Sequence, residues 1–432
     1  MKKAIVVISI LLITTWAKSQ IVDFNVIDSF IVDLGEVQNT NENFNNYSEL
    51  ALILKDVEVV MLGEQSHGEA TTYETKIKLI KYLHQELDFD LLVFESGFYD
   101  CSKAWQKIEE GESVREAMGN SVFSLWSTTK DLIPLAEYLE KVKNSDKPLR
   151  LLGFDSQFTG TYSENYFIND LSNYLKKVKP SILETTKWEH FSKNISLLST
   201  FDFKKLEKNE SQQCIDFLLD LITEIREIEQ NYESEFWVQT LKSTRSYLSD
   251  VSLKTEFRDK QMAENLFWIR ERYPDSKIIC WGATSHFLYN SGLIRMKNPI
   301  IQLLGGNYYK KQPMMGEYVK NKFQDKAYIV GFTAYEGEYG LLRRGKIKIP
   351  KDGTLEFMLG HSKYDNFLLP VNNLNLDGYK SRPLGNFYMK NDIDEVMDAV
   401  IFNRKMKRPR LDRNFFLRIY PQNKYIKPEI ED

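Results

Sequence analysis

The 432-residue sequence has few cysteines, no excess of either charge and, after residue 20, no long apolar run. Three cysteines exclude a dense disulfide framework. No later segment approaches the ~20 consecutive apolar residues that a membrane-spanning helix requires. The 57 Lys and Arg against 61 Asp and Glu give a net charge of −4, which does not support a basic nucleic-acid-binding protein. With 42% hydrophobic residues, the composition predicts a folded globular protein rather than a disordered chain.

The cysteines Cys101, Cys214 and Cys280 are spread over the chain without a C-x-x-C motif. We expect them to be buried small hydrophobic residues, above all Cys280, which lies in an apolar run. One disulfide stays open as an alternative.

Residues 1–19 resemble a secretory signal peptide. Lys2 and Lys3 precede the apolar run 4–13, and the small residues Ala17 and Ser19 predict cleavage before Gln20. The run is too short for a membrane anchor. Removal of this segment leaves 54 Lys and Arg against 61 acidic residues, a net charge of −7. The sequence therefore predicts an exported protein, periplasmic or secreted, without a membrane span.

Short apolar runs alternate with helical patterns, which is typical of an α/β core with a parallel sheet flanked by helices. We predict an α/β core in two parts, 20–162 and 258–403. The segment 163–257 is rich in Lys, Glu, Asn and Ser with leucine at helical spacing, and it predicts a helical insertion that caps the cleft. Residues 404–432 form a basic tail that we interpret as solvated surface. The predicted strands are Val57–Gly63, Leu91–Glu95, Leu149–Asp155, Ile278–Gly282, Tyr328–Phe332 and Ala399–Phe402.

The segment from Gly63 to Gly68, with the sequence GEQSHG, lies between a predicted strand and a predicted helix that starts near Glu69. Such a turn can present Glu64 and His67 together at the edge of the sheet, as a carboxylate that orients an imidazole base. The helix that follows has an apolar stripe, and Lys76 falls within it. This lysine must either find an anion, such as Glu64 or Glu95, or extend its side chain to solvent.

Polar residues also end three other predicted strands, at Glu95, Asp155 and His286. Ligands of open parallel sheets bind at the carboxyl ends of the strands, so these side chains are expected to converge with Glu64 and His67. Such a set suits general acid–base hydrolysis or a metal site.

At these residues the chain resembles the erythromycin esterase family. The family pattern is a Gly-Glu-x-x-His-Gly turn, a basic residue nine places after the histidine and a glutamate at a strand end about thirty residues on, and Glu64, His67, Lys76 and Glu95 match it. Further matches are Gly153-Phe-Asp155, the segment from Arg258 to Asn265, and the strand ending at Trp281 with His286. The resemblance extends from about Val57 to Phe402.

The resemblance implies an esterase with a catalytic set of His67, Glu64, Glu95, His286 and Lys76, and with Asp155, Arg258 and Trp281 at the substrate. Two departures set this chain apart. The family's first histidine of its Trp-Ala-His-Asn-x-His segment is replaced by Ala283, and its arginine is replaced by Lys76, which keeps the charge but loses bidentate geometry.

The function that we predict is hydrolysis of a small-molecule ester or lactone by water that His67 activates, without a cofactor. No G-x-S-x-G motif indicates a serine nucleophile. One alternative is a metal-dependent hydrolase with Glu64, His67, Glu95 and His286 as ligands. Another is an exported protein that binds its ligand without turnover.

Overall fold

The computed structural model describes residues 27–37, 42–228, 230–255, 257–294, 308–372, 374, 376, 379–390 and 393–421. The predicted signal peptide and residues 422–432 of the basic tail lie outside the described residues, so export stays a prediction. Among the helices of the described residues, none is both long and apolar enough to cross a membrane.

The centre of the molecule is one mixed sheet, whose strands follow the order β1-β8-β11-β6-β2-β5-β3-β4, with β7 paired to β6. The six strands from β11 to β4 are parallel to one another, whereas β1, β8 and β7 pair antiparallel. Each of the six parallel strands overlaps one of the six strands predicted from the sequence. The strands of this sheet are β1 (Val32–Asp33), β2 (Val59–Leu62), β3 (Phe89–Gly97), β4 (Arg150–Asp155), β5 (Lys277–Trp281), β6 (Ala327–Tyr339), β7 (Gly345–Ile347), β8 (Asn366–Pro370) and β11 (Ala399–Met406).

Helices cover both faces of this sheet, and each face has its own apolar core. Successive residues of a buried strand point to opposite faces, so Val60 and Leu62 belong to one core and Val59 and Met61 to the other. The first core is closed by α2 (Ser48–Leu54), α3 (Ala70–Leu87), α4 (Phe98–Glu109), α5 (Val114–Gly119) and α7 (Ile133–Val142). The second is closed mainly by α12 (Arg258–Arg272), α13 (Thr284–Phe287), α16 (Met315–Phe323) and α17 (Leu355–Leu359). The predicted α/β class is thereby confirmed.

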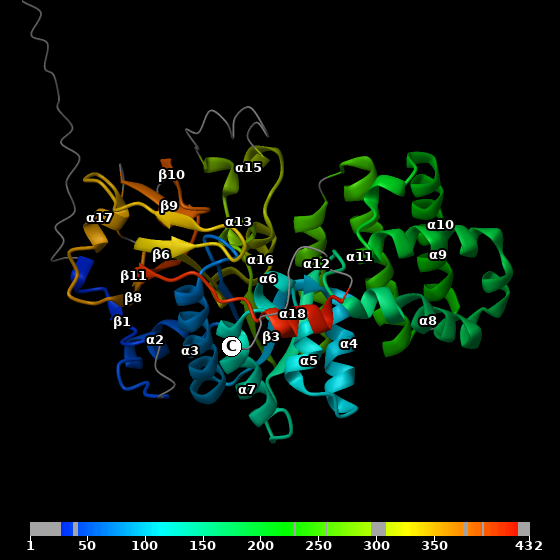
Figure 1. Ribbon diagram of the computed structural model, residues 1–432, viewed down its shortest axis with the longest axis horizontal. Coiled ribbons are helices and arrows are strands. Elements are labelled where there is room, and N and C mark those ends of the chain that lie inside the picture. The colour runs from blue at the N-terminus through cyan, green and yellow to red at the C-terminus, as the bar shows by residue number, and fades with distance from the viewer. Residues whose placement is uncertain are drawn as a thin grey trace, which may run out of the picture.

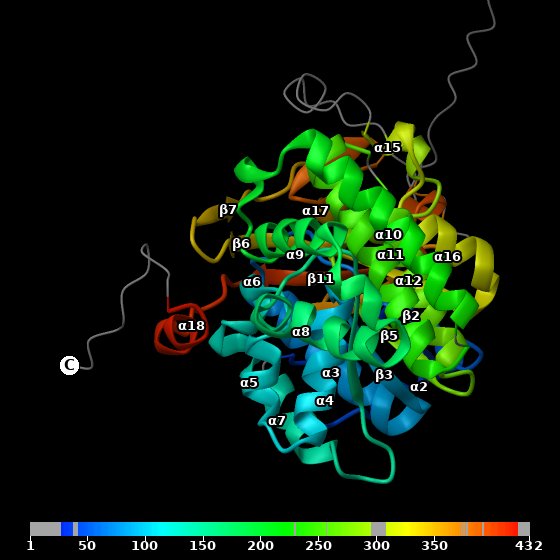
Figure 2. The same ribbon diagram turned by 90° about the vertical axis from the view of Figure 1, so that its right-hand side faces the viewer.

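A separate group of helices follows β4 and has a core of its own. It lies at the right of Figure 1, at the opposite end from β1, and in Figure 2 its helices stand in front of the sheet. Phe236 of this group packs against Phe98 of α4 at a ring distance of 5.8 Å. Its members are α8 (Thr161–Val178), α9 (Thr186–Ser199), α10 (Lys208–Ile228) and α11 (Tyr232–Leu253). The structure is helical over most of 161–253, where the sequence predicted helices at 163–257, and the interpretation of this segment as an inserted cap stays a prediction.

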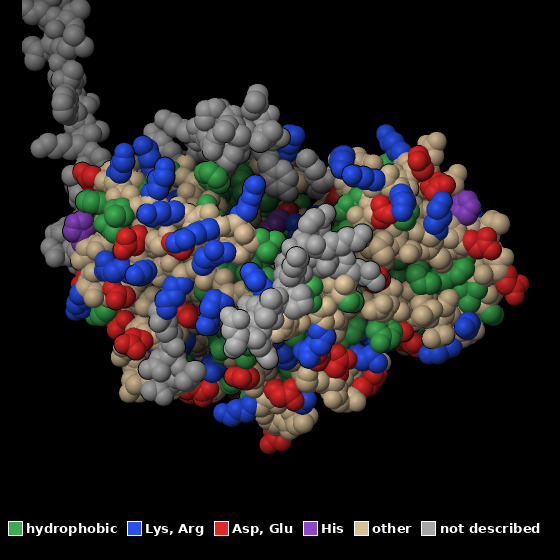
Figure 3. Space-filling model, viewed as in Figure 1, with side chains coloured by type: hydrophobic (Ala, Val, Ile, Leu, Met, Phe, Trp, Pro, Cys, Tyr) green, Lys and Arg blue, Asp and Glu red, His purple; other side chains and the backbone are tan. Residues whose placement is uncertain are grey.

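The remaining features are a small second sheet, three short helices, the cysteines and a group of basic side chains. The strands β9 (Lys380–Leu384) and β10 (Phe387–Lys390) form a separate antiparallel pair. The short helices α6 (Ser124–Ser127) and α15 (Tyr308–Lys311) lie in loops, and α18 (Arg413–Ile419) places Phe415 against α5 at Gly119. All three cysteines are buried free thiols, as we expected. Figure 3, which has the same view as Figure 1, shows Lys and Arg side chains gathered on the surface near β6 and β11.

Candidate active site

The turn from Glu64 to Glu69, which we call the catalytic turn, connects β2 to α3. Gly63 directly precedes this turn. A Cβ atom at Gly63 would lie 2.5 Å from Thr284 Oγ1, so only glycine lets the chain pass this close to α13. His67 Nδ1 lies 2.8 Å from Glu64 Oε1. Because Glu64 is an acceptor, Nδ1 carries the proton of this bond, and Nε2 of His67 is left to bind another proton.

The side chain of Glu64 has no exposure to solvent, and its two oxygens are bound by His67, Trp126 and Lys76. Its Oε1 atom also accepts a hydrogen bond of 2.8 Å from Trp126 Nε1, and its Oε2 atom accepts one of 2.8 Å from Lys76 Nζ. Burial by itself would raise the pKa of Glu64, but the charge of Lys76 and the contact with His67 hold it below its ordinary value. Glu64 is therefore a fixed anion that orients the imidazole.

Lys76 does not extend to solvent. It is fully buried on α3, and its Nζ atom lies 2.8 Å from Glu64 Oε2, 3.2 Å from the carbonyl oxygen of Gly282 and 4.5 Å from the centre of the Trp281 ring. Trp281 also has no exposed surface and stacks on Phe94. The structure thus places Trp281 beneath Lys76, and not at a surface that a substrate could reach.

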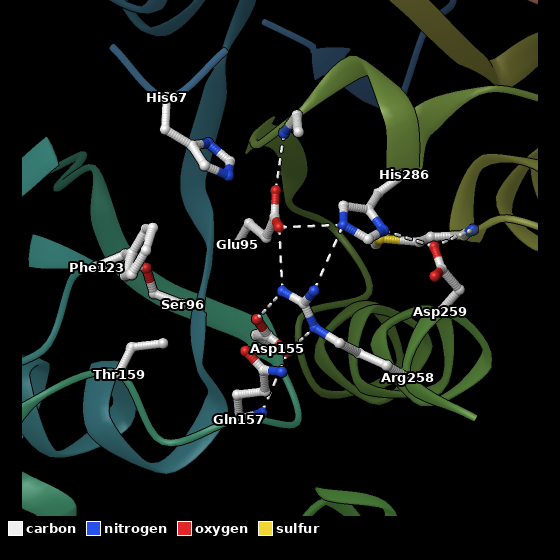
Figure 4. Close-up of polar contacts among 12 residues, drawn as sticks. His67, Glu95, Ser96, Phe123, Asp155, Gln157, Thr159, Arg258, Asp259 and His286 are labelled. Carbon is white, nitrogen blue, oxygen red and sulfur yellow. Dashed lines mark hydrogen bonds and ion pairs between the residues drawn. The ribbon is translucent and has the colours of Figure 1, made fainter. Parts of the chain in front are cut away.

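A second cluster lies across from the catalytic turn, at the ends of β3, β4 and β5 (Figure 4). Arg258, in the first turn of α12, binds both carboxylate oxygens of Asp155, at 3.0 Å from Nε and 2.6 Å from Nη2. The same Nη2 atom donates to Glu95 Oε1 at 3.1 Å. A bidentate guanidinium fixes its partners in one plane, so Arg258 joins the ends of β3 and β4.

His286 completes the second cluster. Its Nδ1 atom lies 2.8 Å from Asp259 Oδ1, and its Nε2 atom lies 3.4 Å from Glu95 Oε1. Burial disfavours the charged imidazole, but Asp259 and Glu95 outweigh this effect and raise the pKa of His286 to about 9. At neutral pH His286 is a cation that can give up a proton.

His67 differs from His286 in charge balance and exposure. Burial alone would lower the pKa of His67, but the contact with Glu64 and the charge of Glu95 raise this pKa above its ordinary value. Its side chain is 32% exposed, against 15% for His286. Figure 4 shows the His67 ring directed toward Glu95, so the two histidines lie on opposite sides of this carboxylate.

Aromatic side chains form one wall beside His67. Phe123 and Trp126 meet its ring edge to face, at centroid distances of 5.6 and 5.1 Å. Packing of this kind restricts the rotation of the imidazole. Trp126 lies in α6, and Phe123 directly precedes this helix. The segment carries no local sequence motif, so the sequence alone did not predict that these two residues lie beside His67.

The structure brings together every predicted site residue, in two groups. Glu64, His67 and Lys76 form the first group with Trp281 beneath them, and Glu95, Asp155, Arg258 and His286 form the second. Asp259 belongs to the second group without having been assigned a role, although it follows Arg258 directly in the quoted motif. At the position where the family has a further histidine, the backbone N–H of Ala283 donates to Glu95 Oε2 at 2.8 Å.

These residues do not form a metal-binding arrangement. Among the described residues, no group of three or more His, Cys, Asp or Glu side chains is placed to hold a metal ion. The oxygens of Glu64 are bound by His67, Trp126 and the ammonium of Lys76, and a cation at this place repels a divalent metal.

Known proteins share both sequence and fold with this chain. The family model described as Erythromycin esterase matches residues 84–406, which include the second cluster but begin after the catalytic turn. "Putative hydrolase YbfO" of Bacillus subtilis is 30% identical over 317 residues, 67% of each chain. Its name and the family indicate a hydrolase.

Solved structures with lower identity show the same fold. One titled as a succinoglycan biosynthesis protein has a TM-score of 0.72 at 19% identity and covers 90% of this chain and 97% of its own. A mutant of the erythromycin esterase EreC in its open conformation has a TM-score of 0.68 at 16% identity, over 86% of this chain and 96% of its own. With a family model that spans most of its length, the chain belongs to the erythromycin esterase family.

Proposed function

We propose that this protein hydrolyses an ester or lactone bond with a water molecule activated by His67. The observation that carries the proposal is the bond of 2.8 Å between His67 Nδ1 and the buried Glu64, because it leaves Nε2 as the proton acceptor on a side chain that is 32% exposed. A base fixed in this tautomer and partly exposed is suited to take a proton from water.

In the proposed reaction the water oxygen bonds to the carbonyl carbon while its proton passes to His67 Nε2. The tetrahedral intermediate then expels the alkoxide, which receives a proton from Nε2 of the charged His286. Arg258 is 26% exposed at its side chain and can stabilise the oxyanion together with His286. Glu95 holds both of these cations in position.

Lys76 and Trp281 have indirect roles in this scheme. Lys76 is fully buried and bound to Glu64, so it acts on His67 through that carboxylate and is a positioning residue. The ring of Trp281 packs against the ammonium group of Lys76 at 4.5 Å and helps to hold it in place. Asp155 is held by Arg258 and orients it toward Glu95.

The two alternatives make different predictions. A metal-dependent hydrolase needs Glu64, His67, Glu95 and His286 as ligands of one ion, and the contacts of Glu64 with Lys76 and Trp126 disfavour this. A binding protein without turnover needs neither histidine to be an acid or a base. Each histidine is bonded to a carboxylate through Nδ1 and has Nε2 left for proton transfer, and this favours catalysis over binding alone.

The test is hydrolysis of aryl esters, a 14-membered macrolide and other lactones by the mature protein, with and without chelator. Loss of general base action costs ~10²–10⁴-fold, so we expect His67→Ala to be nearly inactive and His190→Ala, at an exposed histidine of α9, to retain full activity. Full activity of His67→Ala refutes the mechanism. Activity lost on chelation favours the metal alternative, and absence of turnover on every substrate favours the binding protein.

A further inference from the structure

The catalytic turn is held between two other turns of the chain. Gly340, which follows β6, donates its N–H to the carbonyl oxygen of Gly68 at 2.7 Å, and Gly385, between β9 and β10, donates to that of Gln65 at 2.8 Å. Two residues beyond each contact, a large apolar side chain points into solvent. Leu342 is 67% exposed and Phe387 is 49% exposed. Both sides of the catalytic turn therefore carry apolar surface.

Basic residues link these two turns along β7. The segment from Leu341 to Lys351 contains five Lys and Arg and no acidic residue, on a chain whose net charge is −4. All five basic side chains are exposed. Ile349, an apolar residue of the same segment, is 63% exposed. The five are Arg343, Arg344, Lys346, Lys348 and Lys351.

The neighbouring elements extend the same surface. Lys405 of β11 is exposed beside Glu336 of β6, and Lys407 follows it. The exposed or partly exposed acidic residues of this region are Glu336, Glu338 and Asp352, and Glu338 is paired with Arg344. In Figure 3, Lys and Arg side chains gather over this part of the molecule. We call the exposed side chains of 342–351, Phe387, Lys405 and Lys407 the basic apolar face.

Large apolar side chains mixed with cations are the hallmark of a surface that rests on anionic lipid. A polysaccharide or nucleic acid can bind cations and stack on Phe387, but the aliphatic Leu342 and Ile349 offer it neither charge nor an aromatic ring. We propose that the basic apolar face docks on an anionic lipid surface and so brings the partly exposed His67 close to lipid. The same proposal makes the hydrolysed ester a lipid ester. This part rests on the function proposed above, whereas the docking itself does not.

The test is cosedimentation of the mature chain, beginning at Gln20, with vesicles of phosphatidylcholine alone or with 30% phosphatidylglycerol. We expect binding only to the anionic vesicles, weakened by salt. Each lysine near such a surface contributes about fivefold, so Lys346→Gln, Lys348→Gln and Lys351→Gln together should weaken binding roughly 10²-fold. Leu342→Gln with Phe387→Gln should weaken it about tenfold.

The control is Leu219→Gln with Ile228→Gln, because these α10 side chains are 43% and 47% exposed but belong to the helical group at the other end of the molecule. This control should bind as the unaltered protein does. No binding to anionic vesicles, or equal loss in the control, overturns the proposal. Equally tight binding to soluble heparin that Leu342→Gln and Phe387→Gln leave unchanged also overturns it, in favour of a polyanion. His67→Ala should bind vesicles fully, so a failure of the proposed catalysis is distinguishable from a failure of docking.

Discussion

The buried pair of Lys76 and Glu64 allows a sharp test by replacement of Lys76 with methionine. The side chains have similar length, but the variant leaves the carboxylate of Glu64 without its cation in a place without solvent. Removal of one partner from a buried ion pair costs ~3–5 kcal/mol in the free energy of unfolding. The matched control is Lys81→Met, because Lys81 lies on the same helix in a partly exposed pair with Glu42, where we expect a loss of at most ~1 kcal/mol.

The pH dependence of this variant separates an electrostatic cause from a loss of packing. In the unaltered protein the lowered pKa of Glu64 contributes stability above the ordinary carboxyl pKa, and this contribution is lost as the pH falls through the lowered value. In Lys76→Met the pKa of Glu64 should lie above its ordinary value, because burial then dominates. Stability of the variant should therefore fall as the pH rises from 4.5, by up to ~1.4 kcal/mol per pH unit.

Urea denaturation between pH 3 and 8 measures both effects. The double variant Lys76→Met with Glu64→Gln should recover much of the stability, because no buried charge is left unpaired. The reasoning is refuted if Lys76→Met costs less than ~1 kcal/mol, or if its stability and that of the unaltered protein change with pH in parallel.

Three further predictions concern catalysis. First, kcat/KM should rise with pH through the raised pKa of His67, which must be neutral to act as a base, and should fall again near pH 9 as His286 loses its proton; a pH profile with an aryl ester measures both limbs. Second, Asp259→Asn should move the alkaline limb to lower pH, since it removes the charge that raises the pKa of His286; an unmoved limb contradicts this assignment. Third, Gly282→Ala would place a Cβ atom 2.9 Å from Glu95 Oε2, and the displaced carboxylate should lower kcat by roughly 10²-fold with circular dichroism unchanged.

The parallel core was accessible from sequence because its strands are continuous apolar runs that are buried on both faces. Sequence analysis missed β1, β7, β8, β9 and β10, and all of these except β8 are short or irregular. β7 has three residues, and β9 contains Lys380, Arg382 and Pro383, which weaken any strand pattern. These strands pair antiparallel and lie outside the parallel core, so tertiary contacts decide their structure.

The site was predictable to the extent that it lies at strand ends. Glu64, Glu95 and Asp155 follow strands whose carboxyl ends must share an edge, and this rule brings them together without knowledge of the loops. No such rule places Trp126, which reaches Glu64 from a separate loop, 62 positions away in sequence. The partners of Arg258 were likewise inaccessible, because its contacts with Glu95 and Asp155 depend on how α12 packs against the sheet.

The position of β5 has a consequence for how the chain acquires its structure. β2 and β3 are close in sequence but do not pair with each other, since β5 arrives more than 170 residues later and occupies the place between them. Until that strand is synthesised, two apolar edges remain open to wrong partners. The helices at 161–253 make mostly local contacts and can form earlier. Insertion of β5 is thus the event that joins the catalytic turn to β3, and fragments that end before Lys277 should be unable to place His67 opposite Glu95.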